Sequence, residues 1–318
     1  MRIAVLRGPE AFEVVEAPVP VPRPDEVLIR VAVSGVCASE LEPWLTGPPA
    51  GEERHLGHEV SGVVAEVGAD VTGLAVGDRV GAWVTERGFA EYVAVRAAYC
   101  VPAGAGPLDL ALAEPVACAV NAVEAADVRL GDDVVVIGAG FMGNLVQQLA
   151  ALRGPRQLVV ADARADALER AAALGATRVV DVTREHLPDV VRSLTDGRGA
   201  DLTLECTGTQ AALTACGETT RMSGRIAVVG YHQGAERTIP LAFWNWMAFD
   251  LVNAHFRDVG VIMRGMAVGM RLHAAGRLSL DRLVSHRFPL AEIDRAFAAL
   301  RDKPAGFVKA VITFPEAG

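Results

Sequence analysis

Four side chains in the first part of the sequence could bind a metal ion together. They are Cys37, the adjacent pair His58 and Glu59, and Glu114. Zinc in proteins takes thiolate sulfur, imidazole nitrogen and carboxylate oxygen, and a catalytic zinc site leaves one coordination position open. A single cysteine or histidine is more typical of a buried structural residue. The prediction of a zinc site therefore depends on the combination of these residues and on the type of domain encoded after them in the chain.

A glycine-rich run later in the sequence has the form that binds a dinucleotide. It reads Gly138-Ala139-Gly140-Phe141-Met142-Gly143, comes directly after the apolar segment 133–137 and opens a predicted helix that ends near residue 153. Glycines there let the backbone turn tightly and approach a pyrophosphate, which binds at the positive N-terminus of the helix. The alternative is a glycine-rich turn that has no ligand.

An acidic residue stands where a ribose-binding carboxylate is expected. Asp162 ends the next predicted strand, 24 residues after Gly138, close to the usual spacing of about 20 residues. A carboxylate there accepts hydrogen bonds from a ribose hydroxyl and repels a 2′-phosphate, so Asp162 favours NAD over NADP. Arg164 could weaken this preference, and Asp162 could instead be a solvated loop residue.

The elements that would position these residues change in kind near residue 118. Before it, short β-branched runs at 27–33, 60–67 and 79–84, separated by turn residues, predict a β-barrel or sandwich. After it, predicted strands at 133–137, 158–162, 178–181, 201–205 and 224–230 alternate with helices at 118–126, 141–153 and 166–175. Such alternation predicts an α/β fold with a parallel sheet. Two helices, at about 258–275 and 291–301, and a strand at 308–312 end the chain.

Length and composition narrow the class of protein. A chain of 318 residues suggests two domains. The net charge of −9 disfavours a nucleic-acid partner. Five scattered cysteines do not form a disulfide framework, which favours a reduced, cytoplasmic protein. Because we find neither a signal peptide nor an apolar run of membrane-spanning length, we expect no membrane partner.

With these segments in order, the whole chain resembles the zinc-containing medium-chain dehydrogenases, which include alcohol, sorbitol and threonine dehydrogenases. The resemblance is carried by residues 57–64, 76–80 and 88–93 and by the glycine-rich region. It implies a GroES-like β-barrel catalytic domain built from residues 1–117 and 257–318, and a Rossmann dinucleotide-binding domain at 118–256. It also implies a homodimer or homotetramer formed through edge strands near 250–256.

The resemblance assigns roles at the metal. It implies zinc on Cys37, His58 and Glu114, with Glu59 ligating directly or exchanging with water. Zinc would activate an alcohol as a Lewis acid, hydride would pass to the nicotinamide, and Ser39 would begin the proton relay. Ser39 could instead bond only to the backbone, and Cys118 could be either a buried thiol or, less favoured, a ligand.

The resemblance also assigns cofactor contacts. Thr207 and Val229 match loops that pass beneath the nicotinamide, although they could serve only as turn residues. Lys309 would reach the pyrophosphate of the cofactor, and the alternative is an exposed strand lysine.

Three departures from the family pattern affect the function. The segment Gly81–Gly88 is too short to contain the four-cysteine structural zinc lobe, so we predict at most one zinc per chain. Glu40 replaces the usual Asp. Glu42 stands where many relatives have a histidine, and it could be an acid/base group, a substrate contact or a plain surface residue.

These observations predict an enzyme, an NAD-dependent zinc dehydrogenase. Its substrate would be a secondary alcohol or ketone, in particular a small-molecule polyol, cyclitol, amino-alcohol or sugar derivative. The alternatives are a zinc-free medium-chain quinone or enoyl reductase and a catalytically silent nucleotide-binding protein, since a fold does not determine function.

Overall fold

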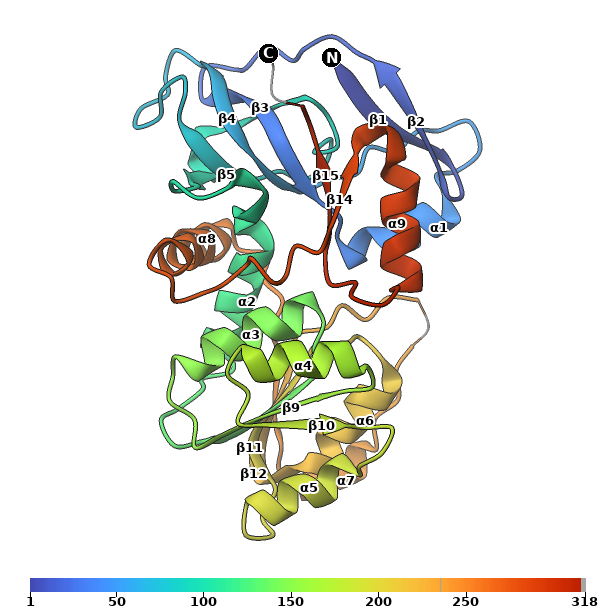
Figure 1. The fold of residues 1–318 in the computed structure, drawn as a ribbon, viewed down its shortest axis with the longest axis vertical. Coiled ribbons are helices and arrows are strands. Elements are labelled where there is room, and N and C mark those ends of the chain that lie inside the picture. The colour runs from blue at the N-terminus through green and yellow to red at the C-terminus, as the bar shows by residue number, and fades with distance from the viewer. Residues whose placement is uncertain (235, 316–318) are drawn as a thin grey trace. The chain divides into compact units, whose positions relative to one another are not determined.

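The computed structural model describes residues 1–234 and 236–315 and divides into two compact units (Figure 1). One unit contains Met1–Ala117 and the chain from Val259 onward, and the other contains Cys118–Asp258. The first unit is therefore built from both parts of the chain that flank the second. The boundaries predicted from the sequence were 117/118 and 256/257, and the second of these lies two residues before the boundary in the structure.

The first unit is built around a seven-stranded sheet with a separate two-stranded sheet. Its strands are β1 (Arg2–Gly8), β2 (Ala11–Glu16), β3 (Glu26–Gly35), β4 (Glu59–Val67), β5 (Arg79–Trp83), β6 (Tyr92–Arg96), β7 (Cys100–Pro102), β14 (His286–Pro289) and β15 (Ala310–Thr313). The order in the large sheet is β14-β15-β3-β4-β5-β7, with β6 also pairing with β3, and β1 pairs with β2. The C-terminal strand β15 thus lies beside β3, which comes from the first part of the chain.

Helices and short 3₁₀ turns complete the first unit. They are α1 (Leu41–Thr46), α8 (Val259–Ala274) and α9 (Ile293–Asp302), with 3₁₀ turns at Ala38–Glu40, Ala97–Tyr99, Leu108–Leu110 and Leu290–Glu292. An aromatic cluster of Trp44, Phe89 and Phe297, all buried, packs α1 and α9 against the sheet core. The indole of Trp44 also donates a 2.8 Å hydrogen bond to Asp294, which fixes α1 to α9.

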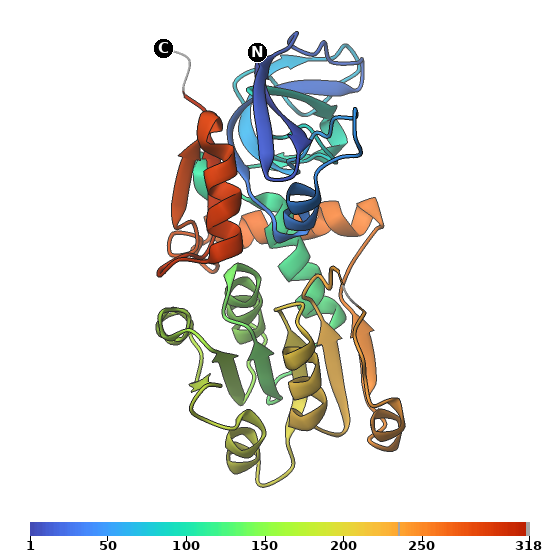
Figure 2. The same cartoon turned by 90° about the vertical axis from the view of Figure 1, so that its right-hand side faces the viewer.

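The second unit is a six-stranded parallel sheet with helices on its two sides (Figure 2). Its strands are β8 (Asp133–Ile137), β9 (Gln157–Asp162), β10 (Arg178–Asp181), β11 (Ala200–Glu205), β12 (Thr220–Val228) and β13 (Asp250–Asn253). Its helices are α3 (Phe141–Ala151), α4 (Ala165–Ala173), α5 (Leu187–Leu194), α6 (Gln210–Thr219) and α7 (Leu241–Trp246). The strand order across the sheet is β10-β9-β8-β11-β12-β13. The chain thus adds strands outward on one side from β8 to β10 and on the other side from β11 to β13, so the order reverses between β8 and β11. Ligands of open α/β sheets bind at such a reversal, outside the carboxyl ends of the strands.

The α/β fold predicted from the sequence is confirmed, and two local predictions are corrected. The first helix of the nucleotide-binding region, α2, spans Ala113–Ala125 and so begins five residues before the predicted Cys118. Pro115 lies in its first turn, where a missing backbone N–H costs little. Cys118, predicted as a buried thiol, is exposed on this helix.

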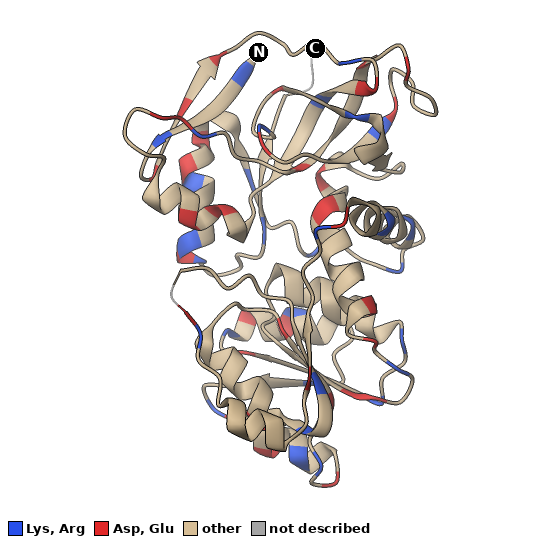
Figure 3. Ribbon diagram, turned by 180° about the vertical axis from the view of Figure 1, so that it is seen from behind, with Lys and Arg blue, Asp and Glu red and all other residues tan. Residues whose placement is uncertain are grey.

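Figure 3 marks the charged positions along the ribbon. Acidic and basic positions are interspersed along the ribbons of both units (Figure 3). Within the described residues, no helix combines the length and the apolar character needed to cross a bilayer.

Candidate functional site

The ends of two neighbouring strands bring three side chains of metal-ligand type together in the first unit. Cys37 comes just after β3, whereas His58 precedes β4 and Glu59 begins it. Because β3 and β4 are antiparallel, with Gly35 opposite Glu59, the end of one strand lies beside the start of the other. One ligand atom from each of Cys37, His58 and Glu59 lies within 4.8 Å of the other two. Sulfur, nitrogen and carboxylate oxygen form a donor set that suits zinc.

The carboxylate of Glu59 lies over Gly35 and reaches a lysine on the far side of β3. Gly35 pairs with Glu59 on one side and with Val311 of β15 on the other. A side-chain carbon at Gly35 would lie 1.9 Å from Glu59 Oε2, so only glycine leaves room for this carboxylate. The Lys309 ammonium is 2.7 Å from the carboxylate, and both side chains are buried. The expectation of an exposed strand lysine at 309 is therefore wrong.

Glu40 holds the histidine in position. Its Oε1 accepts a hydrogen bond from Gly57 N–H at 2.6 Å and lies 3.0 Å from His58 Nδ1. Burial alone would lower the pKa of His58, but the Glu40 carboxylate and the Cys37 thiolate outweigh it and raise that pKa well above 6.5. Gly57 has a φ of +98°, and a side chain there would meet the backbone of Phe89 at 2.5 Å. The segment that presents His58 therefore requires glycine at this turn.

The other residues predicted for the metal site are placed differently. The hydroxyl of Ser39 donates to Cys37 Sγ at 3.2 Å, so it contacts the sulfur of this group directly. Glu114 lies in the first turn of α2 and is not in the group of three within 4.8 Å found among the described residues, although its charge acts on Lys309. Glu42 is exposed on α1.

Sequence reasoning missed the buried ion pair because its partners are 250 residues apart. The position of Lys309 directly before β15, together with the pairing of β15 and β3, places it at Glu59. A signal was nevertheless present in the composition. Lys303 and Lys309 are the two lysines of the chain, and only Lys309 lies in an apolar segment.

In the second unit, the glycine-rich run connects β8 to α3 and is tightly packed. Gly138 has a φ of +103°, and a side-chain carbon at Gly143 would lie 1.7 Å from the Gly138 carbonyl oxygen. Gly140 is the N-cap residue, and Phe141, Met142 and Gly143 form the first helical residues. The run therefore places the N-terminus of α3 at the strand reversal, as a pyrophosphate site requires.

Two polar side chains hold the shape of this turn. Asp162 at the end of β9 accepts a 2.7 Å hydrogen bond from Ala139 N–H through Oδ2 and a 2.9 Å bond from Arg164 N–H through Oδ1. Asn144, fully buried in α3, donates to the carbonyl oxygens of Ala139 and Gly140 at 2.6 and 2.8 Å. Asp162 is thus attached to the glycine-rich turn itself, whereas Arg164 Nε is 3.8 Å from the Asp162 carboxylate.

Thr207 and Val229, the residues predicted to contact the nicotinamide half of the cofactor, lie at the carboxyl ends of strands on the other side of the reversal. Thr207 lies just beyond β11, and its hydroxyl and N–H both donate to the buried carboxylate of Glu205, at 2.6 and 2.7 Å. Val229 lies just beyond β12 and donates its N–H to the Glu205 carbonyl oxygen at 2.8 Å. The Thr207 methyl group also lies close to Gly138, so this loop packs against the glycine-rich run.

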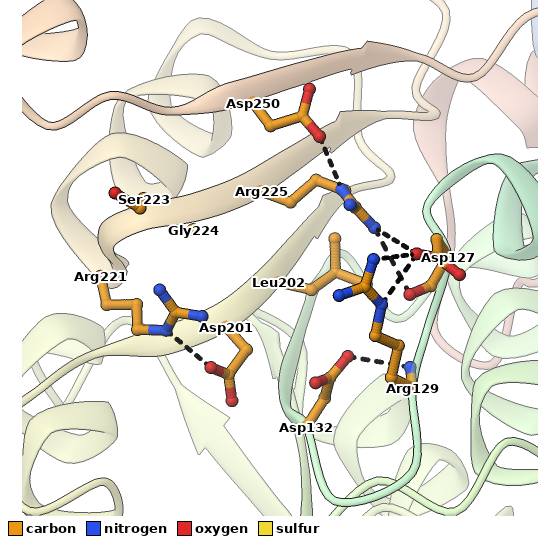
Figure 4. Close-up of a pocket in the computed structure, with 10 residues that line it drawn as sticks. All are labelled: Asp127, Arg129, Asp132, Asp201, Leu202, Arg221, Ser223, Gly224, Arg225 and Asp250. Atoms are coloured by element: carbon orange, nitrogen blue, oxygen red, sulfur yellow. Dashed lines mark hydrogen bonds and ion pairs between the residues drawn. The ribbon is translucent and has the colours of Figure 1, made fainter.

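A cavity of about 120 Å³ lies at the opposite, amino ends of the strands (Figure 4). Its charged side chains form ion pairs with one another. Arg225 contacts Asp250 at 2.9 Å and Asp127 at 3.4 Å, and Arg221 contacts Asp201 at 2.6 Å. This cavity is lined by mutually neutralised groups and is separate from the glycine-rich run, so it is not the dinucleotide site.

The chain was compared with families, curated proteins and solved structures. A family described as "Alcohol dehydrogenase GroES-like domain" matches residues 23–105, and one described as "Zinc-binding dehydrogenase" matches residues 142–270. L-threonine 3-dehydrogenase of Ruegeria pomeroyi is 32% identical, with 94% of this chain and 96% of that protein covered. Sorbitol dehydrogenase of Halalkalibacterium halodurans is 28% identical, with 96% of each covered.

Solved structures share the fold over nearly the whole chain. An alcohol dehydrogenase from Thermus sp. ATN1 has a TM-score of 0.82 at 26% identity, covering 98% of this chain and 99% of that one. A zinc-binding dehydrogenase structure from Sinorhizobium meliloti 1021, bound to NADP, has a TM-score of 0.85 at 24% identity, with 98% and 99% covered. This second likeness shows the fold alone.

Proposed function

Because the chain belongs to the zinc-containing medium-chain dehydrogenases, a family of alcohol oxidoreductases, we propose that it transfers hydride between NAD(H) and a secondary alcohol or ketone with the help of one zinc ion. The observation that carries this proposal is the convergence of Cys37, His58 and Glu59 within 4.8 Å. A zinc-free reductase has no use for such a donor set.

At the metal, each residue has a distinct role in the proposal. Cys37, His58 and Glu59 hold the ion, and Glu114 is an additional ligand candidate from α2. When bound, zinc supplies Lewis acidity that lowers the pKa of an alcohol hydroxyl. Ser39, whose hydroxyl contacts Cys37 Sγ at 3.2 Å, accepts the alcohol proton and passes it outward. Glu42, exposed on α1, is an acid/base or substrate-binding candidate.

Lys309 balances the charge at this site. Burial alone would lower its pKa, but the charges of Glu59 and Cys37 raise it above 10.5, so the side chain stays cationic. We therefore propose that Lys309 acts first on Glu59, by competing with the metal for its carboxylate. Contact between Lys309 and the pyrophosphate of the cofactor requires that this ion pair open.

The proposed cofactor is NAD, held by the second unit. Gly138, Gly140, Phe141, Met142 and Gly143 provide the pyrophosphate turn, and Asp162 and Arg164 stand at the ribose of the adenosine half. The Asp162 carboxylate repels a 2′-phosphate, which supports NAD. The fold itself also accommodates NADP, as the Sinorhizobium meliloti structure shows for that protein. Thr207 and Val229 are the proposed contacts on the nicotinamide side.

The substrate we propose is a polyol, cyclitol, amino-alcohol or sugar derivative. The sorbitol and threonine dehydrogenases among the relatives support this class. We further propose a cytoplasmic homodimer or homotetramer that associates through β13, the edge strand of the parallel sheet. Exposed Trp246 and Leu251, at 76% and 47% accessibility, provide apolar surface at that edge.

Metal analysis tests the proposal directly. Protein purified without chelators or a metal-affinity tag is expected to contain about one zinc per chain and to oxidise a secondary alcohol with NAD. Cys37→Ala is expected to lose the zinc and hydride transfer but to bind NAD as the parent does. Protein that neither contains nor takes up zinc would favour the zinc-free quinone or enoyl reductase, and failure to turn over any alcohol would favour the silent nucleotide-binding protein.

A further inference from the structure

Glu205 is a buried carboxylate at the carboxyl end of β11, next to the strand reversal. Its Oε1 accepts hydrogen bonds from the N–H groups of Thr207 and Gly208 at 2.7 and 2.9 Å, and from the Thr207 hydroxyl at 2.6 Å. Its Oε2 lies 3.0 Å from Nε2 of His232. Within the described residues, the His232 imidazole is paired with the Glu205 carboxylate, and no arginine or lysine forms an ion pair with Glu205.

The Glu205 contact determines which ring nitrogen of His232 is available. An ionised carboxylate only accepts hydrogen bonds, so Nε2 carries the proton that it donates to Glu205. Nδ1 is then an acceptor in the neutral ring and a donor in the protonated ring. This nitrogen is buried and has no hydrogen-bond partner among the described residues. A buried polar nitrogen without a hydrogen-bond partner costs free energy. Because Nδ1 lies near the carboxyl ends of the strands, where ligands of such sheets bind, a bound ligand would supply the missing partner.

The topology indicates which part of a dinucleotide would reach this nitrogen. The two nucleotide halves of a dinucleotide lie on opposite sides of the strand reversal. Asp162, at the end of β9, marks the adenosine side. His232 comes after β12, and Glu205 ends β11, so both lie on the other side of the reversal. The loop that carries Thr207 and Gly208 connects them to the glycine-rich run, since Thr207 packs on Gly138 and Gly208 on Tyr231.

We propose that His232, oriented by Glu205, is a binding residue for the nicotinamide nucleoside half of the cofactor, with Nδ1 forming a hydrogen bond to it. Both the carboxamide and the ribose hydroxyls of that half offer donors as well as acceptors, so either protonation state of His232 finds a complementary group. This inference rests on the proposed NAD-dependent function. It assigns His232 and Glu205 a role that neither the metal site nor the pyrophosphate turn supplies.

Binding measurements without turnover test the inference. NAD⁺ and ADP are titrated by calorimetry into the wild-type protein and into His232→Phe, which keeps an aromatic ring and removes both nitrogens. Loss of one hydrogen bond is expected to weaken NAD⁺ binding by about two- to tenfold, with ADP binding unchanged, because ADP lacks the nicotinamide nucleoside. Unchanged ADP binding also shows that the variant is folded. His186→Phe is the matched control, since this imidazole is exposed in the same unit, and neither ligand should be affected.

The possible results separate the inference from the function on which it rests. If His232→Phe binds NAD⁺ as tightly as the wild type, or weakens NAD⁺ and ADP equally, the inference is overturned while NAD binding stands. If the wild-type protein binds ADP but not NAD⁺, the proposed cofactor and the inference both fail. His232→Gln, which restores a polar side chain, is expected to bind NAD⁺ more tightly than His232→Phe.

Discussion

The Lys309 ammonium and the Glu59 carboxylate form a 2.7 Å ion pair in which both side chains are buried, at the position where zinc is expected to bind. The side chains meet across β3 because Gly35 carries no side chain. Glu59 therefore has a cationic partner from its own chain, and a metal ion would compete with that partner.

Lys309→Met is expected to destabilise the metal-free protein, because it leaves a buried carboxylate without a partner. The expected loss in free energy of unfolding is about 3–5 kcal/mol, measured by urea denaturation. Lys303→Met, at the exposed lysine, should change this free energy by less than about 0.5 kcal/mol. Equal stability of the two variants would show that the ion pair contributes little.

The same pair predicts a direction for the pH dependence. The pKa of Lys309 in the folded protein is raised above 10.5. A raised pKa stabilises the folded state below the unfolded value, and this contribution is lost as the pH rises through the folded value. The stability difference between wild type and Lys309→Met should therefore be constant from neutral pH to about pH 10 and should shrink above it.

Glu40→Gln is expected to weaken zinc binding by about 10- to 100-fold, the usual effect of removing a group that orients a metal-binding histidine. The amide still fills the space beside Gly57 N–H, so the fold should be retained. Competition with a chelating dye measures the affinity. Glu52→Gln, at an exposed carboxylate in the same part of the chain, is the control and should bind zinc as the wild type does.

Asp162→Ser is expected to narrow the preference for NAD over NADP, because the repulsion of a 2′-phosphate is removed. The ratio of kcat/KM for the two cofactors measures it. Since Asp162 also accepts a hydrogen bond from Ala139 in the glycine-rich turn, both cofactors should bind somewhat more weakly as well. An unchanged ratio would mean that Asp162 does not face the ribose.

The cysteines are expected to differ in their rates of alkylation. Burial raises the pKa of Cys100 to about 12, so only about one thiol in ten thousand is ionised at pH 8. Cys118 is exposed and should be alkylated first, as peptide mass spectrometry would show, and Cys118→Ser should remove the early product. Zinc should slow the alkylation of Cys37. Rapid labelling of Cys100 at pH 8 would contradict its raised pKa.

Local sequence patterns were sufficient to predict the α/β fold and the strand and helix that flank Gly138–Gly143. The strand at 133–137 was predicted with the bounds of β8, because a short uninterrupted apolar run bordered by Asp and Gly is typical of a buried strand. The start of α2 was missed because Glu114-Pro115 is typical of a loop, although proline is well tolerated in a first helical turn.

Contacts between distant segments could not be predicted in the same way. The Glu59–Lys309 pair depends on the order β15-β3-β4 and on the absence of a side chain at Gly35, and neither is a local property. The attachment of Asp162 to Ala139 likewise requires knowledge of where β9 ends relative to the turn after β8. The sequence indicated which residues could do chemistry, whereas their partners came from the packing of strands.

The buried ammonium beside Glu59 also has a consequence for how the proposed zinc enzyme would mature. Many small metalloproteins remain unfolded until the metal ion arrives, because the free energy of metal binding is what drives their folding. Here Lys309 neutralises Glu59 without a metal, so under the proposed zinc-dependent function the chain would fold first and bind zinc afterwards. Cells short of zinc would then accumulate folded, inactive protein that needs only the metal, rather than a chain exposed to proteolysis, and activity would return as fast as zinc is supplied.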